Sequence, residues 1–496
     1  MKRMIALLCV LALCLPFASC ASDLEQAAPQ ATAAQEESKT SVKQESGKKP
    51  AQKVENFKIP DELPQGFSVG YGRADITPEP GLPIYNGTGN STHDPLMFTC
   101  TAISDGEGSV ALLCSLDIKN ITVEFSKDIT DRIQKEFNVP ADRVVLNVTH
   151  SHSTPNSSFN STAALKWKVL MLNQAVVAIN TALRDLDPVE GAYVGSGYTE
   201  GITFVRRYLL ADGTYQTNAP QSSNPVAHES DADCQMRTIR IDRKNKKDVL
   251  MVNYQTHYGS ATSMYKNQYS ADFIHVFREE AEKKWDCHFV YHSGASGNLN
   301  FNSAIPGERK YSTFVDATKL GLIPTAESCL AGEEQVAIGP LRFASNWYKA
   351  PVYQDSPEAI EKAQTVNKQA EGSEAYAKAL AENGFTSSRQ IEGILRRASL
   401  GETLDVPFYA ISFGDIGFVT APYEMFDTNG VQVREGSPFK MTFVCSYSNG
   451  GFGYVPSALA FPHGAYEVFI SRFCETTGDD FAVEMVRLLK ECKAQG

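Results

Sequence analysis

The chain lacks the features that mark thiolate metal sites, membrane spans and phosphate-binding loops. Its 11 cysteines include no Cys-x-x-Cys pair, which argues against a zinc knuckle held by thiolates. The cysteines that follow Cys20 leave both disulfides and buried free thiols open. Beyond the N-terminal leader, no apolar run approaches the roughly 20 residues that a membrane span needs. The Gly-rich segment 293–300 lacks the Gly-Lys-Ser/Thr ending of a phosphate loop, so we expect no nucleotide site there.

Positive charge is also scarce. The sequence holds 46 Lys and Arg against 58 Asp and Glu. Without the two basic residues of the leader, 44 against 58 remain, a formal net charge of −14. No cluster of basic residues interleaved with aromatic ones is present. We therefore expect no nucleic-acid partner.

The N-terminus has the pattern of a signal peptide over residues 1–19. Two basic residues precede an apolar stretch, residues 4–17, that is short for a membrane span. The small residues before Cys20 resemble a bacterial lipobox, in which the cysteine is diacylated and becomes the new N-terminus. Ordinary cleavage after Ala21 is the alternative, and we favour lipidation of Cys20.

Residues 20–55 are rich in Ala, Gln, Glu, Ser and Lys and hold almost no large apolar side chain, which is typical of a disordered tether. As a flexible coil the tether would span about 30–35 Å. We predict that it holds one catalytic domain, residues 56–496, on the outer side of a bacterial membrane. Within this domain, the polar stretch Ser356–Gly384 is predicted to be a helical insertion.

Two histidines, two positions apart, follow an apolar strand. Val144–Val148 is predicted to be buried, and His150 and His152 come soon after it. Side chains at i and i+2 of an extended chain share a face, so both imidazoles can enter one site. A neutral imidazole is a metal ligand and a proton carrier near pH 7. The pair therefore indicates metal or acid–base chemistry more strongly than a lone core histidine would.

The same order, a short apolar strand and then a polar turn, occurs five times. The predicted strands are 144–148, 249–252, 289–291, 416–419 and 441–444. The turns after them hold His150 with His152, then His257, the Gly-rich run Ser293–Asn300, Glu424, and Ser448-Asn449-Gly450 with Tyr454. In open α/β sheets, ligand sites gather at the C-terminal ends of strands. We therefore expect these turns to converge on one site.

The predicted fold class is α/β, with a mixed sheet core covered by helices. Continuous apolar strands are typical of a sheet that is covered on both faces. Candidate helices are Phe125–Phe137, Leu165–Leu186, Asp272–Lys284 and Asp479–Cys492. The metal site is expected at the C-terminal ends of the strands.

A metal bound by His150 and His257 would need an anionic ligand as well. Glu424 is the best candidate, because it follows a strand directly and lies beside Pro422. The Gly-rich turn offers backbone N–H groups to an anionic oxygen, although a plain tight turn fits the same residues.

In this order, the segments resemble the neutral ceramidase family of zinc-dependent amidases. The resemblance covers about residues 66–495. Its motifs are Val69–Pro78, the family's opening; Thr149–Ser153, for Thr-His-Thr-His-Ser/Ala; His257–Met264, for His-Gly-Thr-Ser-Met; Ala421–Phe426, for Pro-Gly-Glu-Phe; and Tyr454, in the register of the family's Tyr.

The resemblance implies a zinc ion with four protein ligands. These are His150, His257, Glu424 and Tyr454. It places His152 beside the metal as a proton-handling or substrate-contacting group. It also implies an arginine on the scissile carbonyl oxygen, which matches Arg206, with Arg207 as the alternative.

Two departures from the family bear on the substrate. The family's Asn-x-Gly-Asp-Val-Ser-Pro-Asn motif falls on Ala295–Asn302, which puts Asn300 at the position of its catalytic Ser. An amide nitrogen is not a nucleophile, so we predict hydrolysis without an acyl-enzyme and with Asn300 orienting the substrate carbonyl. We also expect no C-terminal β-sandwich, since about 30 residues follow Tyr466.

The leading interpretation is a membrane-tethered zinc hydrolase that cleaves the amide bond of an N-acyl lipid, a sphingolipid or a related N-acyl compound. A metal-dependent amidohydrolase barrel acting on a small amide is one alternative, with His288 and His292 available as further ligands. The other is a non-catalytic surface lipoprotein that binds a lipid or a glycan on the same fold.

Overall fold

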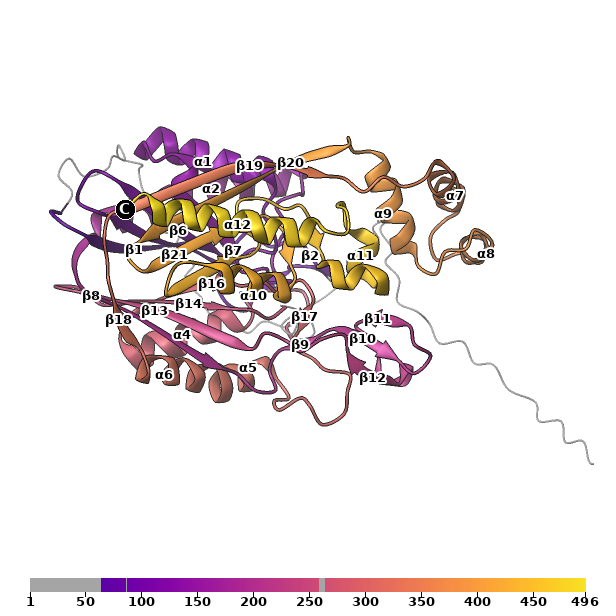
Figure 1. The fold of residues 1–496 in the computed structure, drawn as a ribbon, viewed down its shortest axis with the longest axis horizontal. Helices are drawn as coiled ribbons and strands as arrows, with labels where there is room; N and C mark the ends of the chain where they lie inside the picture. Colours follow the sequence, from indigo (N-terminus) through magenta and orange to yellow (C-terminus); the bar gives the residue numbers. More distant parts are fainter. Residues whose placement is uncertain (1–63, 86, 258–263) are drawn as a thin grey trace, which may run out of the picture.

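The computed structural model describes residues 64–85, 87–257 and 264–496 (Figure 1). The predicted signal peptide, Cys20, the tether and residues 56–63 lie outside these ranges. No helix in the described ranges is both long and apolar enough to cross a membrane. Every cysteine that the structure describes is a free thiol.

Two β-sheets form the centre of the molecule (Figure 1). The larger sheet runs β16 (His288–Ser293), β14 (Val249–Tyr254), β13 (Gln235–Arg243), β8 (Asp187–Tyr198), β1 (Ser68–Asp75), β5 (Met97–Ser104), β6 (Val110–Leu116) and β7 (Val144–Val148), with β18 (Glu334–Val336) beside β8. The smaller runs β19 (Leu341–Pro351), β20 (Thr403–Phe413), β21 (Ile416–Thr420) and β23 (Met441–Cys445). Both are mixed: β6–β7, β14–β16 and β21–β23 pair in parallel, and the neighbouring pairs β5–β6, β13–β14 and β20–β21 are antiparallel.

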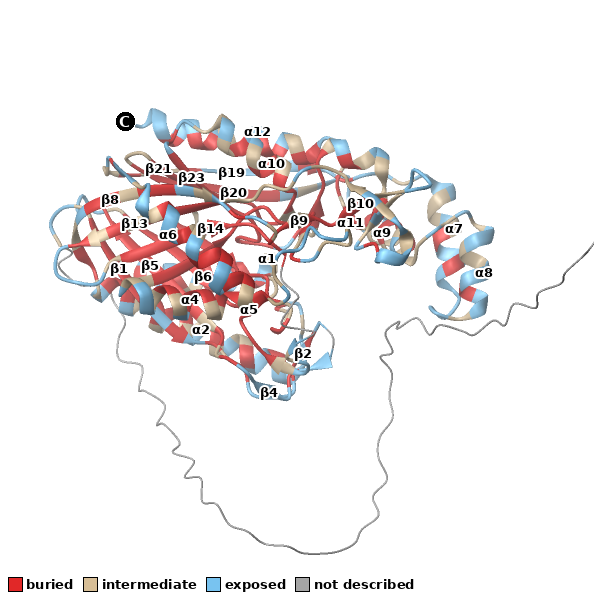
Figure 2. Ribbon diagram, turned by 90° about the horizontal axis from the view of Figure 1, so that it is seen from below, coloured by how far each residue is buried: buried red, intermediate tan, exposed pale blue. Residues whose placement is uncertain are grey.

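Helices cover the outer face of each sheet (Figure 2). The larger sheet is covered by α1 (Val123–Phe137), α2 (Thr162–Arg184), α4 (Phe273–Trp285), α5 (Phe314–Ala317) and α6 (Ile323–Ala331). The smaller is covered by α10 (Asp427–Gly436) and α12 (Thr477–Ala494). The mixed α/β class is thus confirmed, and each of the four predicted helices is present to within three residues.

The inner faces of the two sheets meet in a shared apolar core. Along β6, Leu112 and Leu116 pack toward α1 and α2, whereas Ala111 and Leu113 pack against the other sheet together with Phe418 of β21. This arrangement explains the continuous apolar strands, since both faces of each strand are buried. The sequence led us to expect helices on both faces, but the second face meets another sheet.

The amide of Asn147 connects the two edge strands of the larger sheet. Its Oδ1 accepts a hydrogen bond from the Ser293 N–H of β16 (2.7 Å), and its Nδ2 donates to the Ser446 carbonyl beyond β23 (2.5 Å). The ends of β7, β16 and β23 are thereby fixed relative to one another, and the turns that follow these strands open on one side of the molecule.

The predicted helical insertion forms α7 (Pro357–Asn367) and α8 (Glu374–Glu382), which share a small apolar core with α9 (Ser388–Ala398). No β-sandwich follows α12 in the described part of the chain. The shorter elements are β2 (Pro83–Ile84), β3 (Gly87–Thr88), β4 (Ser91–Thr92), β9 (Phe204–Val205), β10 (Arg207–Leu210), β11 (Tyr215–Thr217), β12 (Pro225–His228), β15 (Gln268–Tyr269), β17 (Leu299–Asn300), β22 (Glu424–Met425), β24 (Tyr454–Val455) and α11 (Ala465–Ile470).

Candidate metal centre

Three histidines converge beyond the C-terminal ends of β7 and β14. His150, His152 and His257 each offer a ring nitrogen, and these atoms lie within 4.8 Å of one another. The Nε2 atoms of His150 and His152 are 3.3 Å apart. Ring nitrogens at this separation need a proton or a cation between them, so the cluster is a candidate metal centre.

The backbone and a carbonyl group orient His150. Its φ of 63° lies in the left-handed region, where a turn reverses the chain directly after β7. Its Nδ1–H donates to the Lys119 carbonyl (2.6 Å), which leaves Nε2 for the cluster. Burial lowers the pKa of His150 to about 3, and the Lys119 charge acts in the same direction. The imidazole is therefore neutral at pH 7, which is the ligating form.

The other two histidines are neutral for the same reason. Burial lowers the pKa of both His152 and His257 well below the ordinary value. The Nδ1 atom of His257 lies 3.3 Å from the Ser296 carbonyl of the Gly-rich turn. An acceptor of this kind behind a histidine fixes which ring nitrogen faces a metal.

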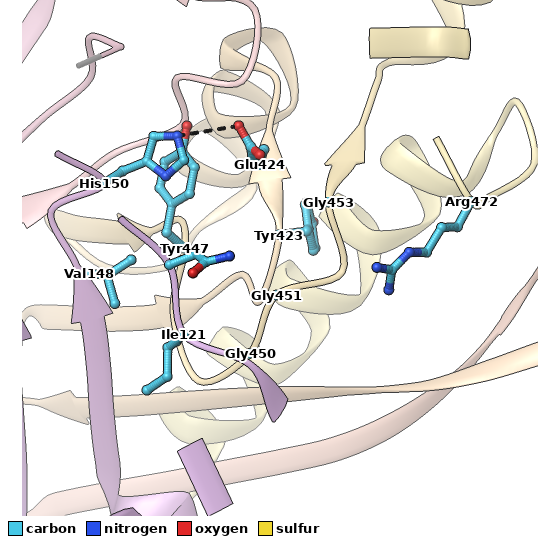
Figure 3. Close-up of a pocket in the computed structure, with 11 residues that line it drawn as sticks. Ile121, Val148, His150, Tyr423, Glu424, Tyr447, Gly450, Gly451, Gly453 and Arg472 are labelled. Carbon is cyan, nitrogen blue, oxygen red and sulfur yellow. Dashed lines mark ion pairs between the residues drawn. The ribbon is translucent and has the colours of Figure 1, made fainter. Parts of the chain in front are cut away.

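Glu424 supplies an anionic group at the same place. Its Oε2 lies 3.6 Å from Nε2 of His150 (Figure 3) and has no hydrogen-bond donor in the described chain. Burial raises the pKa of Glu424 to about 7, while Tyr454 and the Arg206 charge act in the opposite direction. Glu424 faces Tyr454 across the parallel pair β22–β24. Neutral imidazoles with one buried, unsatisfied carboxylate oxygen fit a divalent metal ion.

The two adjacent arginines, Arg206 and Arg207, have different hydrogen-bond partners. Arg206 donates from Nη2 to the Tyr454 hydroxyl (3.0 Å) and from Nε to Oε1 of Glu467 (2.8 Å). Arg207 points the other way, to Glu229 and to Oε2 of Glu467. Burial opposes the charge of Arg206, but Tyr454 and Glu467 raise its pKa above the ordinary value. A charged donor is thus held at the candidate metal centre.

Asn300 lies at the same cavity, on the short strand β17. Its Nδ2 donates to Oδ1 of Asn218 (2.9 Å), and its Oδ1 accepts from the Phe301 N–H (2.8 Å). An amide nitrogen carries two hydrogens, so one donor remains for a ligand.

All predicted metal and catalytic residues line one cavity of about 270 Å³, here called the front cavity. The remaining lining residues are Tyr85, Lys119, Asn218, Asn302 and Tyr466. None of the lining residues that the structure describes is aliphatic, so the front cavity is suited to a polar group. The cavity holds neither His288 nor His292, and His292 is fully buried between the sheets.

Several residues that line or support the candidate metal centre were missed at the sequence level. Lys119 follows β6 through a short polar turn, so the strand-then-turn pattern would have found it if applied there. Tyr447, which stacks on His150 with ring centroids 4.3 Å apart, and Glu467 carry no local signal, because their partners are distant in sequence.

Two facing mixed sheets with a buried histidine cluster define a mixed α/β protein with a candidate metal centre. Its fold is that of the neutral ceramidases. A structure described as a ceramidase complexed with C2 is similar at a TM-score of 0.64, with 18% identity over 87% of this chain and 76% of its own. The neutral ceramidase from Pseudomonas aeruginosa is similar at a TM-score of 0.63, with 18% identity over 88% of this chain and 75% of its own. No protein-family model and no curated protein sequence matches the chain.

Proposed function

We propose that the chain is a zinc-dependent amidase that cleaves the amide bond of an N-acyl lipid or a related N-acyl compound. The observation that carries this proposal is the cluster of three neutral histidines beside Glu424 and the charged Arg206 in one cavity. The neutral ceramidase structures of the same fold support it.

Four residues would hold the zinc ion: His150, His257, Glu424 and Tyr454. When bound there, zinc would lower the pKa of a water molecule to about 7 and polarise the substrate carbonyl. His152, whose ring is neutral, would accept or return a proton at Nε2.

Two donors would act on the carbonyl oxygen of the substrate. Arg206 is fixed by Glu467 and Tyr454, so its guanidinium needs no rearrangement when negative charge develops. The free hydrogen of the Asn300 amide is the second donor. Because Asn300 cannot act as a nucleophile, hydrolysis would proceed without an acyl-enzyme.

The polarity of the front cavity bears on the substrate. Its described wall of histidines, asparagines and tyrosines offers hydrogen bonds near the scissile amide, and these residues form no apolar groove for an alkyl chain. We therefore favour an N-acyl compound with a polar amine portion over ceramide. Any long chain would lie outside this cavity.

Attachment to a membrane is part of the proposal. The lipobox-like sequence at Cys20 would anchor the chain to the outer side of a bacterial membrane. Replacing Cys20 with Ser should move the protein to the soluble fraction, and unchanged membrane attachment would contradict the anchor.

The experiment that tests the activity is a screen of N-acyl amides with the full chain, before and after removal of metal by a chelator. The proposal expects hydrolysis that stops on chelation and returns when zinc is added. Metal-independent hydrolysis would contradict it. Tight binding of an N-acyl compound with no turnover would favour a non-catalytic binder, for which Asn300 at the family's Ser position is the supporting observation.

A further inference from the structure

A second cavity adjoins the candidate metal centre. It has a volume of about 150 Å³, and His150 and Glu424 line it as well as the front cavity (Figure 3). From these two residues it extends between the segment before α1 and the Gly450–Gly453 loop to Arg472. We call it the rear cavity. Of the predicted metal and catalytic residues, His150 and Glu424 alone line it.

Arg472 is an unusual arginine in this protein. Its guanidinium is turned toward the loop Gly451–Gly453 (Figure 3) and makes no hydrogen bond or ion pair with any described residue. Its Nε–H is buried without an acceptor. Burial lowers the pKa of Arg472, and the charge of Arg396 adds to this effect, whereas the charge of Glu124 acts in the opposite direction.

Every buried arginine of the described chain has a carboxylate partner. The pairs are Arg206–Glu467, Arg207–Glu229, Arg237–Asp233, Arg243–Asp185, Arg278–Asp117 and Arg397–Asp355. Arg472 is half-buried, and its buried Nε–H lacks the carboxylate acceptor that these six arginines have. The partner missing from the protein would then be supplied by a ligand with an anionic oxygen.

The loop beside Arg472 offers further donors. The N–H groups of Gly450, Gly451 and Gly453 donate no hydrogen bond within the described chain. A Cβ atom at Gly451 would come within 2.8 Å of the Ile121 carbonyl, so only glycine allows the loop to approach this wall. Backbone N–H groups that lack an acceptor and line the same cavity as a guanidinium are available to an oxyanion.

The other end of the rear cavity limits what the anion can be. Ile121 and Val148 supply apolar surface there. A small anion with a short alkyl part therefore fits this end of the cavity better than inorganic phosphate, which has no apolar part. The guanidinium fork suits a carboxylate, which can accept two parallel hydrogen bonds.

We propose that the rear cavity binds a short-chain carboxylate, with its carboxylate group on Arg472 and its alkyl part toward Ile121 and Val148. Amide hydrolysis releases a carboxylic acid, so this ligand would belong to the product class of the reaction. That link rests on the proposed function, whereas the binding site itself does not.

The test is a calorimetric titration of the full chain with sodium propionate. One propionate should bind per chain with saturation, and neither propionamide, its neutral analogue, nor sodium chloride should reproduce the binding. Arg472→Gln should weaken propionate binding by about tenfold or more, since a charge-assisted hydrogen-bond partner is lost. Arg472→Lys, which keeps the charge, should weaken it less.

Two further variants locate the bound carboxylate. Asn120→Asp adds a negative charge to the cavity wall at nearly constant shape and should also weaken binding. Arg487→Gln, which removes an exposed arginine of α12, should leave it unchanged. A carboxylate bound at the metal instead would be lost in His257→Ala and insensitive to Arg472→Gln, and that result would overturn the proposal.

The remaining outcomes of the titration also test the proposed carboxylate site. No saturable binding by the unaltered protein, or equal binding of chloride, would overturn a carboxylate site. Propionate binding that depends on Arg472 in a protein without amidase activity would support the rear cavity and count against the proposed function alone.

Discussion

The two cavities that share His150 and Glu424 differ in the hydrogen bonds that the protein makes to an arginine at each. In the front cavity, Glu467 and Tyr454 hold Arg206 in place. In the rear cavity, the Arg472 guanidinium makes no hydrogen bond or ion pair with a described residue. A guanidinium that protein groups hold in place is positioned before a ligand binds. A guanidinium without hydrogen-bond partners can instead take its partner from a ligand.

The largest effect is expected when the front cavity loses a histidine. His257→Ala should remove most of the bound metal and reduce hydrolysis to background, because a mononuclear zinc centre depends on each ligand. Unfolding should be nearly unchanged, since the apolar cores do not include the cluster. His275→Ala, on α4 and away from the cavity, is the control. Full zinc occupancy in both His257→Ala and His150→Ala, measured by metal analysis, would contradict the assignment of these histidines as zinc ligands.

The second-largest effect is expected for Asn300, the hydrogen-bond donor at the position of the family's catalytic Ser. Asn300→Ala should lower kcat by about 10²-fold with zinc still bound, because one donor to the developing oxyanion is lost. Asn302→Ala, at the same cavity, should change kcat less. Unchanged kinetics in Asn300→Ala, or a covalent acyl adduct on Ser293 or Ser296, would show that the mechanism has been misassigned.

Glu467→Gln tests whether the position of Arg206 depends on its carboxylate partner. The change removes the negative charge and replaces one of the two oxygens that accept from Arg206 and Arg207 by an NH2 group, and a small displacement of a catalytic donor costs about 10–10²-fold in kcat. KM should change less. Glu229→Gln is the matched control, since Glu229 is also buried but pairs with Arg207 rather than Arg206. Equal losses in the two variants would indicate a general loss of structure.

The same glutamate should shape stability in acid. Burial alone would raise the pKa of Glu467, but Arg206 and Arg207 hold it below its ordinary value of 4.5. Its contribution is therefore complete above about pH 4.5 and is lost as the pH falls through the lowered pKa. Urea unfolding at a series of pH values should show a shallower acid decline for Glu467→Gln than for the unaltered chain. Identical declines would contradict this account.

The smallest effect is expected in the rear cavity. Arg472→Gln should change the free energy of unfolding by no more than about 0.5 kcal/mol, because no protein contact of the guanidinium is lost. Arg207→Gln, which breaks two buried ion pairs, should cost about 3–5 kcal/mol. A large loss in Arg472→Gln would mean that Arg472 has a structural partner.

Local pattern predicted most of the fold. The strands 144–148 and 441–444 are short apolar runs bounded by polar turns, and the helices near them were found to within three residues. The division of the strands between two sheets was not predicted. A strand buried by helices and one buried by another sheet carry the same apolar sequence, so only tertiary structure separates them.

The sequence pattern alone predicted those residues of the candidate site that directly follow a strand. His150, His257 and Glu424 have this position, and all three line the front cavity. The assignment of Tyr454 and Arg206 required the family resemblance, because single Tyr and Arg residues in loops carry no local signal. Glu467 and Arg472 could not have been found, since their significance lies in the presence or absence of partners brought together by the fold.

The central claim is that the front cavity holds a zinc ion. Crystals of the full chain grown without chelator, measured on both sides of the zinc absorption edge, test it most directly. The account predicts one anomalous difference peak per chain, within bonding distance of His150, His257, Glu424 and Tyr454. No zinc peak at these residues, or a zinc ion bound only elsewhere, would contradict it.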